Sequence, residues 1–183
     1  MPNYVYNIIK TTADKKKLLD KIKEAGGICK YYMPMPEELQ RTASPNNVVS
    51  DEEYAERLAN GTTTEELHGG AYMKHYNSES QMKEFLEKHG ATNWYDWANV
   101  KWGTKWGDFD WSVEIEGNGD ALVLNYTTAW SPLGDEVMDM FLADIKNCEF
   151  VWEEEQGFGE KFSVTDGVAE FVHAWTEYDT QDE

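Results

Sequence analysis

The stretch NWYDWANVKWGTKWGDFDW, residues 93–111, holds five of the eight tryptophans of a 183-residue chain. Such a density is too high for a fully exposed loop, and the interleaved Asn, Asp and Lys residues are too polar for an ordinary core element. Buried indole N–H groups need acceptors, which Asn93, Asp96 and Asn99 are close enough in sequence to supply. We therefore expect an aromatic loop that seals one end of a sheet, with lysines stacked on the indole rings.

The same segment also allows a functional interpretation. Aromatic side chains interleaved with Lys and Asn suit the stacking of a nucleobase or a sugar. The candidate stacking residues are Trp94, Trp97, Trp102, Trp106 and Lys105. The acidic surroundings argue against a polyanionic strand as the ligand.

Outward from this segment, runs rich in β-formers predict strands at residues 4–11, 28–33, 111–116, 121–128, 150–153, 162–165 and 168–175. Apolar stripes at helical spacing predict helices at residues 14–25 and 79–89. Ser78 is the expected N-cap of the second helix, and Gly90 its stop. A third helix is expected to open at Ser131-Pro132 and to run to Ile145.

The polar stretch 37–92 is interpreted as a mainly helical insertion, with its best helix at residues 50–59 behind a Ser50–Glu53 capping box. Without it, the element order is β-α-β followed by β-β-α-β and a terminal strand. This order predicts an α+β fold, ferredoxin-like, with a mostly antiparallel sheet and helices packed on one face. We expect a single domain over residues 1–183.

Charge is distributed unevenly along the chain. The net charge is −19, and residues 110–183 contribute −17 of it, with two lysines against nineteen acids. Such a field repels nucleic acid phosphates, so direct nucleic acid binding is not expected, and it favours a basic partner protein. The alternative is that the acids only keep a small protein soluble.

The candidate partner-binding carboxylates lie on predicted strands, on one helix face and in one acidic run. They are Glu114, Glu116, Asp135, Glu136, Asp139, Glu153, Glu154 and Glu155. Alternating strand positions and one helix face can space carboxylates along a single surface, as mimicry of DNA phosphates would require.

No motif predicts catalysis, a metal or a cofactor. The four histidines show no ligand spacing, and neither Gly117-x-Gly119 nor Gly157-x-Gly159 lies between a strand and a helix as a dinucleotide site requires. Cys29 and Cys148 match no metal or redox spacing and are expected to be buried free thiols. No apolar run is long enough to span a bilayer and no signal peptide is visible, so a cytoplasmic location is expected.

Three blocks of the sequence resemble the family of YubB-like proteins of phages and plasmids, with a ferredoxin-like domain of the Api92 type. The blocks are the start at residues 1–3 leading to MPEEL at 35–39, NWYDW at 93–97 with WGTKW at 102–106, and TAWSP at 128–132 with EEQGFG at 154–159. The resemblance implies a ferredoxin-like fold and a mobile-element or viral origin. It brings no known reaction and no catalytic residue. Leu133, where the pattern commonly has a second proline, and the polar 40–78 insertion depart from it.

These observations favour a non-enzymatic accessory protein of a phage or mobile element. It would bind a basic host protein through its acidic surface, as a counter-defence inhibitor that mimics DNA toward a defence nuclease. One alternative is a small-molecule or nucleotide-binding protein, including an enzyme, that uses the tryptophan segment. Another is a component of a virion or of a replication complex. The sequence gives no indication of oligomeric state.

Overall fold

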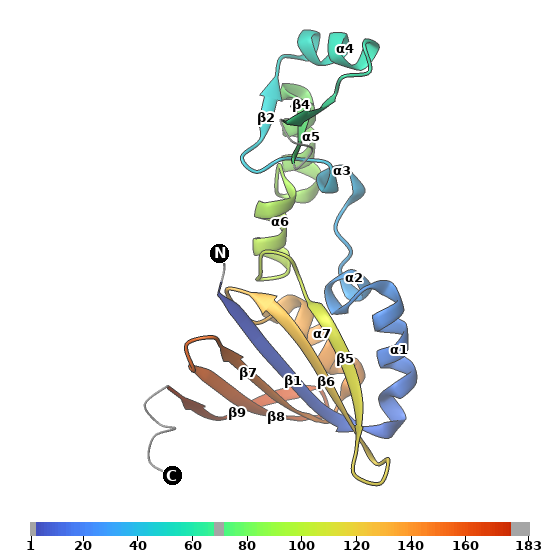
Figure 1. Ribbon diagram of the computed structural model, residues 1–183, viewed down its shortest axis with the longest axis vertical. Helices are drawn as coiled ribbons and strands as arrows, with labels where there is room; N and C mark the ends of the chain where they lie inside the picture. Colours follow the sequence, from blue (N-terminus) through green and yellow to red (C-terminus); the bar gives the residue numbers. More distant parts are fainter. Residues whose placement is uncertain (1–2, 68–71, 177–183) are drawn as a thin grey trace. The chain divides into compact units, whose positions relative to one another are not determined.

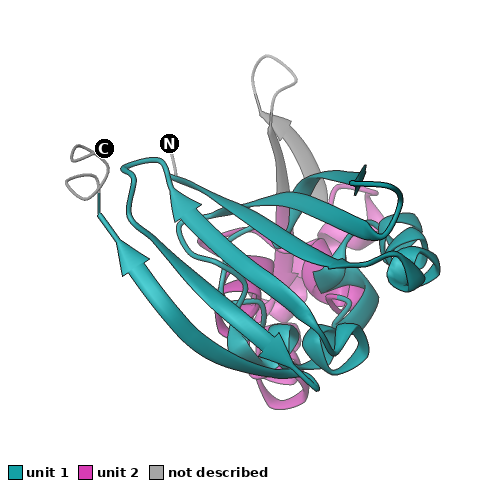
Figure 2. Ribbon diagram, turned by 90° about the horizontal axis from the view of Figure 1, so that it is seen from below, with its two compact units in different colours: residues 1–34, 101–183 teal, residues 35–100 magenta. Residues whose placement is uncertain are grey.

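The computed structural model describes residues 3–67 and 72–176, and the chain divides into two compact units. Unit 1 comprises residues 1–34 and 101–183, and unit 2 comprises residues 35–100 (Figure 2). Each unit has its own sheet and its own helices. No helix among the described residues is long and apolar enough to cross a membrane.

Unit 1 is built on a six-stranded sheet in the order β5-β6-β1-β7-β8-β9, in which every neighbouring pair is antiparallel. The strands are β1 Tyr4–Thr12, β5 Phe109–Glu116, β6 Ala121–Ala129, β7 Cys148–Glu154, β8 Gly159–Thr165 and β9 Val168–Trp175 (Figure 1). The strands predicted in these regions and the mostly antiparallel sheet are confirmed. They were predictable because β-formers dominate each run.

The helices of unit 1 are α1 Lys16–Ala25, α2 Ile28–Tyr32 and α7 Asp135–Ile145, and a 3₁₀ turn, η1 Ala13–Lys15, precedes α1. Along β1 the burial alternates, so Val5 and Ile9 are buried while Tyr6 and Ile8 are exposed. The Tyr126 hydroxyl of β6 lies 3.8 Å from the Met138 sulfur of α7, which identifies the buried face as the one that α7 covers. The core of unit 1 lies between this face and the helices. The two cysteines are free and buried there, as expected.

Two predictions in unit 1 are wrong. Residues 28–33 were expected to form a strand but form helix α2. The helix expected from Ser131-Pro132 starts at Asp135, with Gly134 as its N-cap, because the Ser131 hydroxyl donates to the Gly103 carbonyl and the Gly134 N–H donates to the Trp102 carbonyl. Both errors come from contacts with residues far along the chain, which local propensity does not reveal.

The tryptophan segment contains a helix and is only partly a loop. Helix α6, Trp94–Lys101, begins after Asn93, whose side-chain oxygen accepts from the Asp96 N–H at 2.9 Å. Residues 102–108 then form turns that lead into β5. In these turns the Thr104 hydroxyl donates to the Ala129 carbonyl at 2.6 Å and accepts from the N–H of the same residue at 3.1 Å. The segment therefore holds its turns against β6 through a polar side chain.

Unit 2 consists of short helices and a three-stranded sheet. The helices are α3 Glu37–Gln40, α4 Asp51–Ala59, α5 Glu79–His89 and most of α6, and the strands are β2 Asn47–Val49, β3 Thr64–Leu67 and β4 Tyr72–Ser78. Strand β4 lies in the middle, parallel to β2 and antiparallel to β3. The predicted helices α4 and α5 are confirmed with their Ser50 and Ser78 caps. The three strands were not predicted, because they are short and polar and depend on each other for pairing.

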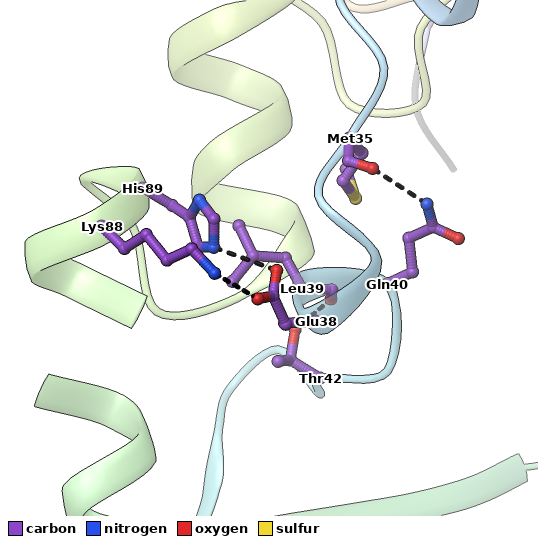
Figure 3. Close-up of polar contacts among 7 residues, drawn as sticks. All are labelled: Met35, Glu38, Leu39, Gln40, Thr42, Lys88 and His89. Carbon is purple, nitrogen blue, oxygen red and sulfur yellow. Dashed lines mark hydrogen bonds and ion pairs between the residues drawn. The ribbon is translucent and has the colours of Figure 1, made fainter. Parts of the chain in front are cut away.

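An ion cluster ties α3 to the end of α5 (Figure 3). Glu38 accepts from the Lys88 ammonium at 2.5 Å, and its other carboxylate oxygen lies 3.2 Å from His89 Nε2. Two hydrogen bonds beside it fix the short helix: the Thr42 hydroxyl donates to the Leu39 carbonyl, and the Gln40 amide donates to the Met35 carbonyl. The hydrogen bond from Lys88 holds the pKa of the Glu38 carboxyl below its usual range.

The ion cluster leads us to expect a lowered pKa for the Glu38 carboxyl. Glu38 is expected to titrate below the ordinary glutamate value in a carbon-detected NMR titration, and the substitution K88A is expected to raise its midpoint. K83A, which removes a lysine from the same helix, is the control and should leave the midpoint unchanged. Because the charged form is favoured in the folded state, the stability from this contact is present above the ordinary pKa and is lost as the pH falls through the lowered one. An unshifted Glu38 would contradict the ion cluster.

A buried carboxylate joins three segments of unit 1. Asp108, 7% exposed, accepts from the backbone N–H of Ile28 at 2.6 Å, from that of Cys29 at 2.8 Å and from Trp111 Nε1 at 2.5 Å. Gly27, with φ of 121°, precedes α2, and a Cβ there would overlap the Asp108 carboxylate. The start of α2 thus depends on one acceptor from the tryptophan segment.

We expect D108N to lower the free energy of unfolding by about 2–4 kcal/mol, because an amide presents a donor where a buried N–H needs an acceptor. The measurement is urea unfolding followed by tryptophan fluorescence. E114Q, which removes one exposed carboxylate from the neighbouring strand, is the matched control and should change stability by less than about 0.5 kcal/mol. Equal effects of the two substitutions would show that Asp108 is not a structural acceptor.

Candidate functional site

A groove on unit 1 runs between α7 and strands β7, β8 and β9, with a volume of about 240 Å³. The register places Phe150 of β7 directly opposite Phe162 of β8, so both rings point to the α7 side. The two rings stack with centroids 5.9 Å apart, and Trp152 lies next along β7 on the same face. The floor of the groove is therefore aromatic, and Met138 of α7 forms part of its wall.

The aromatic floor continues past the groove. Phe171 of β9 meets Phe162 edge-on at 5.9 Å and is 59% exposed. Phe158, in the turn before β8, packs edge-on against Trp152 at 5.4 Å and is 37% exposed. Exposed aromatic rings that adjoin a groove are typical of surfaces that bind another molecule.

Carboxylates form the rim of the groove. Asp135 and Asp139 are one helical turn apart on α7, and Glu160 lies opposite Trp152 in the β7–β8 register. Within the described part of the chain, none of these three carboxylates takes part in an ion pair. The groove thus combines an apolar floor with a rim of uncompensated negative charge.

The eight carboxylates predicted for partner binding do not form one surface. Glu116 forms an ion pair with Lys10, Glu114 is two residues earlier on β5, and Glu153 lies opposite Tyr6. Tyr6 belongs to the exposed side of β1, so these three carboxylates lie on the sheet face away from α7.

The other five carboxylates lie toward α7 or in a turn. Asp135 and Asp139 line the groove, whereas Glu136 is paired with Lys101 at 3.3 Å. Glu154 pairs with the buried Val5 of β1 and so lies on the side of β7 that faces α7, and Glu155 is in the turn that follows. Of the predicted residues the groove therefore gathers only the two aspartates of α7.

Glu160 and the aromatic floor were not predicted as parts of a site. The sequence does indicate that Glu160 and Phe162 share a face of β8, because side chains alternate along a strand and those two residues apart point to the same side. That alternation does not say which strand lies next to β8, so the pairing with Trp152 and Phe150 needs the register.

The predicted stacking residues differ in burial and are divided between the two units. Trp97 and Trp102 are buried at 5% and 6% exposure, and Trp94 is half-buried. Trp94 and Trp97 belong to unit 2, and Trp102 and Trp106 belong to unit 1. The Trp102 indole donates to the Met33 carbonyl at 2.8 Å, not to one of the interleaved Asn or Asp side chains that were expected to accept.

Lys105 stacks on indole rings, as expected. Its ammonium lies 4.7 Å from the Trp106 ring centroid and 5.0 Å from that of Trp130. Both rings are more than two-fifths exposed. This contact orders a surface turn of unit 1. Among the described residues, no group of three or more His, Cys, Asp or Glu side chains is arranged to hold a metal ion.

Comparison with known proteins gives a distant structural similarity. No family model matches the chain, and no curated protein matches it. The chain is similar to the crystal structure of a protein Api92 from Yersinia pseudotuberculosis, of the family DUF1281, at 10% sequence identity and a TM-score of 0.47. The similarity covers 96% of this chain and 98% of that one.

Proposed function

We propose that this chain is a non-enzymatic binding protein, whose groove between α7 and strands β7–β9 takes a basic, amphipathic segment of another protein. The observation that carries the proposal is the rim of unpaired carboxylates, Asp135, Asp139 and Glu160, around an aromatic floor. A lysine or arginine stem packs along aromatic rings while its charged end reaches a carboxylate. A purely acidic ligand or a purely apolar one would leave half of this lining unsatisfied.

The charge of unit 1 supports the same partner. Residues 1–34 and 101–183 hold 11 Lys and Arg against 23 Asp and Glu, a net charge of −12. Such a field speeds the encounter with a basic protein, and the effect weakens as salt is added. Contacts in the groove would then decide which basic segment stays bound.

The sequence resemblance adds an origin to this proposal. It suggests a phage- or mobile-element-encoded accessory protein that acts on a basic host protein in the host cytoplasm, as a counter-defence inhibitor. With the short helix α2 and the elements of unit 2 left out, the order β1-α1-β5-β6-α7-β7 and the strand arrangement β5-β6-β1-β7 support a ferredoxin-like core extended by β8 and β9. The division of the acids between two faces favours recognition by the groove over mimicry of a DNA backbone.

The proposal predicts that an 18-residue helical peptide of Lys and Leu binds the protein, and that D135N/D139N/E160Q weakens this binding about tenfold, or roughly 1.4 kcal/mol. Fluorescence anisotropy of the labelled peptide at two or more salt concentrations measures both effects. The affinity of the wild-type protein should fall as salt rises. A peptide with Glu in place of Lys should not bind.

The control variant, E114Q/E155Q/E170Q, removes the same number of exposed carboxylates outside the groove and should change the affinity by less than about twofold. F171A, at a largely exposed ring beside the floor, should weaken binding without unfolding the protein. If the two triple variants lose affinity equally, total charge and not the groove would explain the binding, and the proposal would fail.

A further inference from the structure

A second hollow surface lies in unit 2, between α3, α4, β4 and α5. It consists of two adjoining hollows of about 460 and 330 Å³, which share Arg41, Tyr54 and Asn77 in their lining. His75 and Tyr76 of β4 also line the larger one. Both volumes are in the range of pockets that hold small molecules.

Asn77 is the unusual residue of this lining. It is 7% exposed, and its Oδ1 is buried without a hydrogen-bond partner among the residues that the structure describes. Close to it, the backbone N–H of Tyr76 donates to the Thr63 carbonyl at 3.0 Å, and Asn47 donates to the His75 carbonyl at 3.1 Å. A buried acceptor without a partner costs stability, so Oδ1 calls for a ligand that supplies the missing donor. The terminal torsion of Asn is soft, which lets the amide turn toward that ligand.

The charge of the larger hollow is opposite to that of the unit around it. Residues 35–100 hold five Lys and Arg against twelve Asp and Glu, yet the described residues that line the larger hollow include Arg41 and no acid. The smaller hollow adds Glu38 and Glu84, whereas His75 and Tyr76 line the larger one alone. Arg41 is paired with Glu37 at 3.3 Å, but both side chains are about three-quarters exposed or more. An exposed pair of this kind is worth little, so an anion can replace Glu37 at small cost.

Aromatic surface completes the hollow. Tyr54 of α4 and Tyr76 of β4 both line it. The Arg57 guanidinium, which is paired with Glu53 at 2.9 Å, lies 4.0 Å over the Tyr76 ring and fixes the ring. A flat ring that enters the hollow would meet aromatic side chains that α4 and β4 hold in place.

We infer that this hollow binds a small organic anion with a flat ring that carries an N–H donor, such as a mononucleotide. Arg41 holds the phosphate, the tyrosines contact the ring, and the Asn77 amide bonds the donor and acceptor on the ring edge. The inference is independent of the groove on unit 1, because it uses no residue of that groove.

Isothermal titration of the full chain with adenosine and uridine 5′-monophosphate tests the inference. We expect at least one nucleotide to bind, adenosine and inorganic phosphate each to bind at least about tenfold more weakly, and R41A to weaken the nucleotide about tenfold. K83A removes the same charge from α5 outside the lining and should change the affinity by less than about twofold. Absence of nucleotide binding at millimolar concentration, or equal effects of R41A and K83A, would overturn the inference.

N77A separates the role of the amide from a role in folding. Since its acceptor has no partner in the described structure, N77A should leave the thermal midpoint of the free protein unchanged or slightly higher. It should still weaken the nucleotide at least about tenfold. Nucleotide affinity equal to that of the wild-type protein in N77A, or phosphate alone binding as tightly as the nucleotide, would show that the hollow does not recognise the ring.

Discussion

The architecture of unit 1 depends on the buried carboxylate of Asp108. This carboxylate caps the N-terminus of α2 by accepting from the Ile28 and Cys29 N–H groups, and it fixes Trp111 near the start of β5. Close by, the Trp102 indole donates to the Met33 carbonyl, so the residues at which the chain leaves unit 1 and re-enters it are bonded to each other. Because the two ends of the insertion, residues 35–100, are held together, it can be accommodated without changing the sheet or the helices of unit 1. The conformational entropy lost on joining the ends of a long loop grows only slowly with its length.

The Asp108 contact also shows why one part of the fold could not be predicted from the sequence. The strands of unit 1 and helices α1, α4 and α5 follow from periodicity and caps, which act within a few residues. Residues 28–32 have the β-prone composition Ile-Cys-Lys-Tyr-Tyr, and they form a helix because Asp108, about 80 residues away, accepts its first N–H groups. The start of α7 was misplaced for a similar reason, since Gly134 packs against Gly103. Tertiary contacts override local propensity at both positions.

The candidate sites show a different limit of sequence reasoning. The density of acidic residues in the sequence pointed to Asp135 and Asp139, which line the groove. It also grouped them with three carboxylates on the other face of the sheet, Glu114, Glu116 and Glu153. Alternation predicts which residues of a strand share a face, but it does not say which strands are neighbours or which face the helices cover. Asn77 gave no signal at all, because an unpaired amide is recognisable only when every possible partner is placed.

Net charge is therefore a weak guide to the ligand of a particular cavity. Charges more than about 8–10 Å apart are largely screened at physiological salt, so a ligand responds to the lining it touches and less to the total of the chain. In unit 1 the rim of the groove and the unit as a whole are both negatively charged, so a basic partner is attracted by both. In unit 2 the charge of the lining and the net charge disagree, because the described lining of the larger hollow holds Arg41 and no acid inside an acidic unit. An excess of surface carboxylates would then slow the approach of an anion without preventing it from binding, and would favour ligands whose ring contacts add to the charge contact.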